Sequence, residues 1–156
     1  MKSPRVTEAP ALLRRARAED ASPLASLAAA ALPEPWCEAG FRAQLARPEA
    51  RVWLARAGAE PVGFLAAHRV LDELQILALA VAAPARRRGT GRGLLERALA
   101  SEPDAREVHL EVRSNDAAAQ VFYARQGFLP VGRRPAFYPD GVDAVLMRRT
   151  LPPGSG

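Results

Sequence analysis

Glu111 and Tyr123 are the side chains of this sequence best suited to moving protons. Residues 106–113, REVHLEVR, alternate polar and apolar types, which predicts a strand with Glu111 on its polar face. A carboxylate there can take a proton from an attacking nucleophile, and a phenol 12 residues later can protonate a leaving group. The alternatives are a solvated carboxylate on an outer face and an ordinary half-buried helix tyrosine.

A second chemical motif is the basic, glycine-rich loop at residues 81–93, VAAPARRRGTGRG. It follows an apolar run at residues 74–82 and leads into a predicted helix with Leu94, Leu95, Ala98 and Leu99 on one face. Glycines let the backbone turn tightly, and the first amides of a helix have no partner within it. The loop therefore predicts a diphosphate site, to which the arginines add positive charge.

Four other interpretations of this loop are a P-loop, a dinucleotide-binding fold, a nucleic-acid patch and a solvated basic turn. A P-loop needs Gly-Lys-Ser/Thr, which is missing, so that class is excluded. A dinucleotide fold places its glycines after the first strand, whereas several elements precede this loop. A nucleic-acid patch lacks interleaved aromatic residues here but stays open, as does a solvated basic turn.

Metal and thiol chemistry have few candidate residues. The chain has one cysteine, Cys37, and two histidines, His68 and His109, too few for a zinc site of the usual Cys/His kind. We expect no metal, and a small core or near-surface thiol at Cys37 rather than a nucleophile. A lone cysteine forms no internal disulfide, which fits a reducing compartment, so we expect a cytoplasmic protein.

The pattern of elements predicts a mixed α/β sheet of about seven strands with helices on both faces. Helices are expected around Leu24–Ala31, from Trp36 to Pro48, after the glycine-rich loop, and over 116–126, where Gly127 ends the helix. The apolar run at residues 74–82 is typical of a central strand covered on both faces. The predicted strands are residues 11–17, 51–57, 62–70, 74–82, 106–113, 128–134 and 142–149.

Composition agrees with a single globular domain over residues 1–156, with residues 1–10 as a flexible tail. Of 156 residues, 49% are hydrophobic and 25% charged, which excludes a disordered chain, a coiled coil and a collagen-like repeat. No apolar stretch is long enough for a membrane span, and the N-terminus has no secretory h-region. The net charge of +5 is concentrated in residues 86–156 and suggests an anionic partner.

Within the loop, Arg86-x-x-Gly89-x-Gly91 resembles the acetyl-CoA signature of the GCN5-related N-acetyltransferase (GNAT) superfamily. The predicted order of elements also matches that fold over nearly the whole chain. The resemblance implies that the amides of residues 87–92 hold the pyrophosphate and that the strand end pairs with the pantetheine amides. The implied cofactor residues are Leu79, Ala80, Val81, Arg86, Arg87, Arg88, Gly89, Thr90, Gly91 and Arg92.

Residues 110–128 closely resemble the LEVR…N…A…LY…GF segment of the RimI family of ribosomal-protein-alanine N-acetyltransferases. That resemblance makes Glu111 the general base and Tyr123 the general acid. Pro35-Trp36 is a further RimI-like feature, and Arg133-Arg134-Pro-Ala-Phe-Tyr-Pro139, followed by Asp143-Ala144 and Met147, resembles the family's RRxYYP…DA…M ending. The implied acceptor groove is lined by Glu34, Trp36, Phe137 and Tyr138.

Three positions depart from the family pattern. The family's Asn five residues after the base is Asp116 here, with Asn115 one place earlier. We expect both to contact the cofactor, and Asp116 is alternatively the N-cap of its helix. Ala78 replaces an Asn in the strand before the loop, and Phe137-Tyr138 replaces a double Tyr, which removes one hydroxyl near the acceptor.

The resulting hypothesis is an acetyl-CoA-dependent protein Nα-acetyltransferase that works by direct attack of the amine on the thioester. The resemblance implies the N-terminal alanine of the eighteenth small-subunit ribosomal protein as acceptor. We expect no metal, nucleic-acid or membrane partner, and we expect the protein to be a monomer. The rivals are a GNAT enzyme that acetylates lysine side chains or a small amine, and a CoA-binding module without catalysis.

Overall fold

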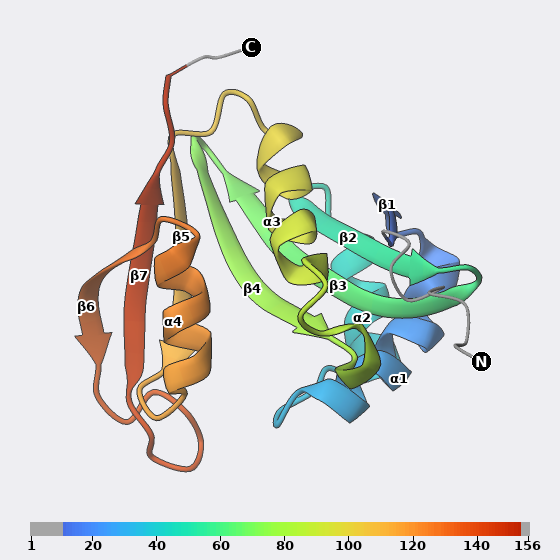
Figure 1. The fold of residues 1–156 in the computed structure, drawn as a ribbon, viewed down its shortest axis with the longest axis horizontal. Coiled ribbons are helices and arrows are strands. Elements are labelled where there is room, and N and C mark those ends of the chain that lie inside the picture. Colours follow the sequence, from blue (N-terminus) through green and yellow to red (C-terminus); the bar gives the residue numbers. More distant parts are fainter. Residues whose placement is uncertain (1–10, 154–156) are drawn as a thin grey trace, which may run out of the picture. The chain divides into compact units, whose positions relative to one another are not determined.

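The computed structural model describes residues 11–153. In that range, seven strands form one sheet in the order β1-β2-β3-β4-β5-β7-β6, and four α-helices connect them (Figure 1). The predicted order of elements and the fold class are confirmed, whereas the predicted tail at residues 1–10 lies outside the described residues. The elements are β1 Leu12–Arg15, α1 Ala21–Ala31, α2 Glu38–Leu45, β2 Ala50–Ala57, β3 Glu60–Val70, β4 Glu73–Val81, α3 Thr90–Ala100, β5 Glu107–Arg113, α4 Ala117–Arg125, β6 Leu129–Arg134 and β7 Ala144–Thr150.

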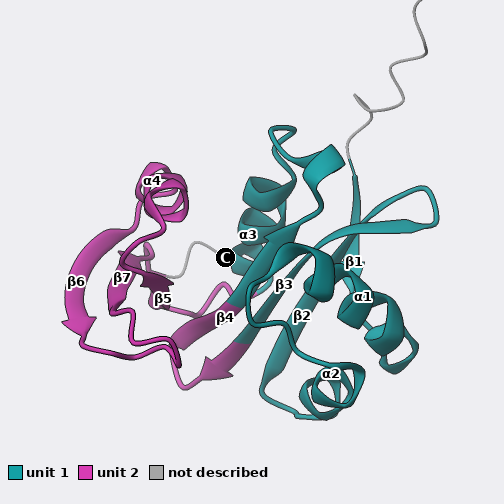
Figure 2. Ribbon diagram, turned by 90° about the horizontal axis from the view of Figure 1, so that it is seen from below, with its two compact units in different colours: residues 1–67, 78–101 teal, residues 68–77, 102–156 magenta. Residues whose placement is uncertain are grey.

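The chain divides into two compact units (Figure 2). Unit 1 comprises residues 1–67 and 78–101 and contains the glycine-rich loop. Unit 2 comprises residues 68–77 and 102–156 and contains both predicted proton-transfer residues.

In unit 1, helices lie on both faces of the strands. Val52 and Leu54 of β2 belong to the apolar cluster that α1 and α2 cover, where Leu24, Phe41 and Phe64 are fully buried. The intervening Trp53 faces the other way, because the guanidinium of Arg97 on α3 lies 5.1 Å from its ring centroid. Because successive side chains of a strand point to opposite faces, β2 contributes residues to the packing on both faces of the sheet.

In unit 2, β5 is the central strand. It pairs in parallel with β4 and antiparallel with β7, and α4 runs alongside β5 and β7 (Figure 1). Val108, Leu110 and Val112 are buried, whereas the residues between them are partly exposed. This alternation confirms the predicted strand and puts Glu111 on the polar face.

The expectation that β4 is covered on both faces is wrong. Its burial alternates, and Leu77 is 38% exposed while Leu74 and Ile76 are buried. The register explains this, because Glu73 and Gln75 stand beside Glu107 and His109 on the polar face of the sheet. An apolar run therefore does not by itself show that both faces of a strand are covered.

Two smaller points concern the N-terminal helices and the membrane. The second helix begins at Glu38 rather than Trp36, with Cys37 as N-cap, and the Cys37 thiol is exposed. Within residues 11–153, no helix has the length and apolar character needed to cross a membrane.

Candidate active site

The glycine-rich loop links the end of β4 to the start of α3. After the short 3-10 turn Ala83–Ala85, two residues adopt left-handed backbone angles, Arg87 with φ 65° and Gly89 with φ 77°. Gly89 is the N-cap of α3, where it needs no side chain and meets no steric penalty. These two angles turn the chain sharply between the 3-10 turn and the first residue of α3.

The loop contains six consecutive backbone amides, those of residues 87–92, that donate to no backbone carbonyl of the described residues. Arg86 N–H donates to the carbonyl of Ala83, and Gly93 N–H donates to that of Gly89. Between them, no backbone carbonyl in residues 11–153 accepts a hydrogen bond from the amides of residues 87–92. A run of amides at the positive end of a helix suits a polyanion, so the geometry fits the pyrophosphate that the sequence predicts there.

The loop side chains have different tasks. Arg86 donates from Nε to the Val81 carbonyl at 2.9 Å, so it ties the loop back to the end of β4. Thr90 is buried and its hydroxyl contacts the Ala85 carbonyl at 3.4 Å, which ties the start of α3 to the 3-10 turn. Arg87, Arg88 and Arg92 are exposed and can supply charge to phosphates.

Gly63 on β3 sets how closely α3 approaches the sheet. A Cβ at this position would lie 3.2 Å from the Ala80 carbonyl oxygen and 3.2 Å from a Leu94 methyl. A larger residue would push the first turn of α3 outward, so this glycine indirectly positions the loop amides.

Glu111 is the central acid of the polar face in unit 2. Its side chain is 24% exposed, and its Oε2 lies 3.7 Å from Nε of Arg134 on β6. Arg134 in turn lies over the ring of Phe137, with 5.6 Å between its Cζ and the ring centroid. A predicted base and a predicted acceptor-binding residue are therefore joined through one arginine that the sequence analysis did not assign to the site.

Tyr123 lies half-buried on α4, edge-on to Phe122 and Phe128 with centroids 5.2 and 5.5 Å away. Burial raises the pKa of its phenol well above the usual value, and the nearby Asp116 and Tyr138 raise it further. The phenol is therefore protonated at neutral pH, as a general acid must be.

A tight turn couples α4 to the end of β5. Asp116 accepts a hydrogen bond from the Ala119 amide at 3.0 Å, which confirms its predicted N-cap role. The Gln120 side-chain amide donates to the Arg113 and Ser114 carbonyls at 3.0 and 3.2 Å. These bonds hold α4, the helix of Tyr123, against the end of β5, the strand of Glu111. Asn115 lies exposed in the turn between the two elements.

The segment between β6 and β7 forms an aromatic hairpin. Phe137 and Tyr138 stand edge to face with centroids 5.0 Å apart, and Phe137 is 43% exposed. Arg113 on β5 lies 4.3 Å from the Tyr138 ring centroid and pairs with Asp140 at 2.8 Å. Asp143 closes the other end by accepting from the Ala136 amide and the Arg133 guanidinium.

The other two predicted acceptor residues lie in unit 1. Trp36 is partly buried and packs edge-on against Phe41 at 5.2 Å, so it anchors the segment between α1 and α2. Glu34 is exposed two residues earlier. Their contact with an acceptor stays a prediction.

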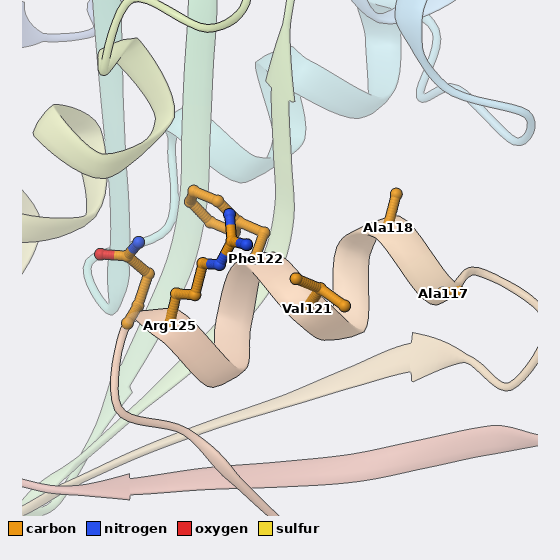
Figure 3. Close-up of a pocket in the computed structure, with 6 residues that line it drawn as sticks. Ala117, Ala118, Val121, Phe122 and Arg125 are labelled. Atoms are coloured by element: carbon orange, nitrogen blue, oxygen red, sulfur yellow. The ribbon is translucent and has the colours of Figure 1, made fainter.

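A shallow hollow of about 560 Å³ runs along α4 and was not anticipated from the sequence (Figure 3). Figure 3 shows the Phe122 and Arg125 side chains beside one another, with Val121 and Ala118 further along the helix. α4 has no fully buried residue, so its apolar side chains remain available to a ligand. The lining residues are Ala117, Ala118, Val121, Phe122, Arg125 and Gln126.

A cluster of possible metal ligands also lies on the polar face. His109 Nε2 is 2.9 Å from Glu107 and 3.5 Å from Glu73, and the three donor atoms lie within 4.8 Å of one another. The cross-strand register brings them together, which residue counts could not reveal.

Comparison with known proteins identifies the family of the chain. The model of the acetyltransferase (GNAT) family matches residues 21–128. An N-alpha-acetyltransferase RimI of Mycobacterium tuberculosis is 36% identical over 121 residues, covering 74% of this chain and 76% of its own. The ribosomal protein bS18-alanine N-acetyltransferase of Escherichia coli K12 is 35% identical over 119 residues, with 72% and 79% covered.

A solved structure shows the same fold. The crystal structure of the Escherichia coli ribosomal-protein-S18-alanine N-acetyltransferase superposes with a TM-score of 0.84 at 26% identity, covering 94% of this chain and 96% of that one. The chain therefore belongs to the GNAT family of acetyltransferases, and within it to the RimI-type N-acetyltransferases.

Proposed function

We propose that the protein transfers the acetyl group of acetyl-CoA to the N-terminal α-amine of another protein. The observation that carries this proposal is the connected group Glu111–Arg134–Phe137, which joins a carboxylate base to an exposed aromatic hairpin. A base beside a surface able to hold a peptide start is what an Nα-acetyltransferase needs. Relatives named for bS18-alanine acetylation support the N-terminal alanine of that ribosomal protein as the acceptor, and hence the cytoplasm as the location.

The cosubstrate site of this proposal begins at the loop. The amides of residues 87–92 would hold the pyrophosphate of acetyl-CoA, with further charge from Arg88 and Arg92. The end of β4 at Leu79–Val81 would pair with the pantetheine amides.

The chemistry needs two proton transfers. Glu111 would accept a proton from the α-amine, directly or through a water, as the amine nitrogen attacks the thioester carbonyl. The new C–N bond forms, the C–S bond breaks, and the Tyr123 phenol would protonate the departing thiolate. The products are the acetylated N-terminus and CoA. An α-amine, with a pKa of about 8, asks less of this base than a lysine at about 10.4.

The decisive experiment measures thiol release from acetyl-CoA against a peptide panel. The panel contains Ala-, Ser-, Met- and Gly-starting peptides, the same peptides with a blocked N-terminus and one internal lysine, and spermidine. We expect release only with a free α-amine, fastest with the Ala-starting peptide that copies the bS18 start.

The alternative outcomes identify the rivals. Release with blocked peptides or spermidine alone would assign the chain to lysine or small-amine acetylation. Binding of acetyl-CoA without turnover on any acceptor would favour a CoA-binding module. Either result contradicts the proposed function.

A further inference from the structure

We infer that Arg134 is a specificity-determining residue, which makes the site accept neutral amines and reject ammonium groups, and so favours α-amines over lysine side chains. This inference rests on the proposed function, because it concerns the base Glu111 and its amine substrate. Nothing in the sequence motif assigns Arg134 this task.

The first argument is position. Within residues 11–153, Arg134 is the one residue that forms an ion pair with Glu111, at 3.7 Å. Its side chain is 56% exposed, yet the Phe137 ring lies against the guanidinium, so the cation has a preferred place. An amine that reaches the Glu111 carboxylate must therefore also come close to this guanidinium.

The second argument concerns the other charges around Glu111. Arg113 and His109 flank it on the same face of β5, but Arg113 is paired with Asp140 and His109 with Glu107 and Glu73. Leu146, directly opposite on β7, has no charge. Arg148, opposite His109 on β7, lies further along the same face. Arg134 is the cation that forms an ion pair with Glu111, so it offsets the charge of this carboxylate most directly.

The third argument is the state of the two amine classes. At pH 7 roughly a tenth of an α-amine is neutral, against roughly 0.04% of a lysine. A carboxylate alone would attract the ammonium form of either amine and could deprotonate it in place. A neighbouring guanidinium offsets that attraction, so the enzyme depends on amine that is already neutral, and this dependence penalises lysine.

The experiment compares two peptides with four proteins. One peptide starts with a free alanine and contains no lysine; the other has the same sequence with a blocked N-terminus and one lysine. The proteins are the wild type, Arg134→Gln, Arg134→Lys and the control Arg133→Gln. Arg133 lies on the same strand with similar exposure, 58%, but pairs with Asp143. kcat and KM are measured at pH 7 and pH 9, where neutral lysine is about a hundredfold more abundant than at pH 7.

We expect the ratio of kcat/KM for the α-amine peptide to that for the lysine peptide to fall about tenfold or more in Arg134→Gln, mainly because lysine turnover rises. Arg134→Lys and Arg133→Gln should keep the wild-type ratio. In the wild type the ratio should narrow from pH 7 to pH 9, because neutral α-amine rises only about tenfold over that range.

An unchanged ratio in Arg134→Gln would overturn the inference, as would an equal loss on both peptides, which would indicate a structural role. If Arg133→Gln changed the ratio equally, a general charge effect would replace the local one. These outcomes leave the proposed function standing, whereas a wild type inactive on the free-alanine peptide would remove the function itself.

Discussion

The loop of unit 1 and the polar face of unit 2 solve different problems with different parts of the chain. The loop offers backbone amides, six in succession, while Arg86 is tied back to β4 and Thr90 is buried. The polar face of unit 2 offers side chains, with Glu111, Arg134 and Phe137 held by one another. The loop should therefore be more sensitive to changes of backbone angle than to the loss of any one arginine, whereas unit 2 should fail on the loss of a single functional group.

The largest test of this contrast is Glu111→Gln, which keeps the shape and removes the base. We expect kcat to fall by roughly 10²–10⁴-fold, with acetyl-CoA affinity unchanged because the loop is untouched. Stopped-flow thiol release and calorimetric binding measure the two quantities. Glu107→Gln is the matched control, since Glu107 lies on the same face of the same strand and pairs with His109. Wild-type turnover in Glu111→Gln would remove Glu111 from the mechanism.

Tyr123→Phe tests the second functional group. We expect a loss of turnover of about 10²–10⁴-fold, and in the wild type no alkaline loss of activity from this phenol below its ordinary pKa of 10.0. Because the folded-state pKa is raised, the neutral phenol contributes stability that is fully present below pH 10 and is lost as pH rises further. Tyr123→Phe should therefore unfold less steeply than the wild type in an alkaline titration followed by circular dichroism. Equal alkaline unfolding of both proteins would contradict the burial argument.

A backbone test in the loop is Gly89→Ala. An added Cβ would meet no atom within 4 Å, so the cost arises from the φ of 77° and should be about 1–2 kcal/mol in urea unfolding. Acetyl-CoA affinity should fall several-fold, because the amides turn away from their common direction. Arg87→Gly is the complementary change and should stabilise by roughly 1 kcal/mol, since Arg87 already adopts a φ of 65°. If Gly89→Ala changes neither stability nor affinity, the backbone of the loop is less constrained than its angles indicate.

The smallest expected effect is on the free energy of unfolding and comes from changes at Asp116, the N-cap of α4. Asp116→Ala should cost about 1 kcal/mol, because it removes the side-chain acceptor of the Ala119 amide. Asp116→Asn keeps that acceptor and restores the residue of the family pattern, so thermal unfolding should shift little. A change of acetyl-CoA affinity in Asp116→Asn would add a cosubstrate contact to the cap. Equal destabilisation by both variants would mean that the negative charge, and not the hydrogen bond, supports α4.

The sequence predicted those parts of the fold and site that depend on local pattern. The alternation around Glu111, the glycine after α4 and the loop that opens α3 are visible within a few residues. The pair between Glu111 and Arg134 could not be predicted in this way, because it depends on β7 lying between β5 and β6. The partial exposure of β4 has the same origin, since the register with β5 places Glu73 and Gln75 on the polar face, and Leu77 lies two residues further along that face.

The order of strands leaves β6 at the edge of the sheet, exposed along its whole length. Open edges invite another chain to add a strand, yet this one interrupts its ladder with a bulge between Pro130 and Gly132. Proline has no amide hydrogen to donate, and Arg133 and Arg134 place two positive charges in succession at the end of the strand. The stretch that we assign to acceptor choice thus also protects the enzyme from self-association and aggregation, so variants there should be checked for solubility as well as for selectivity.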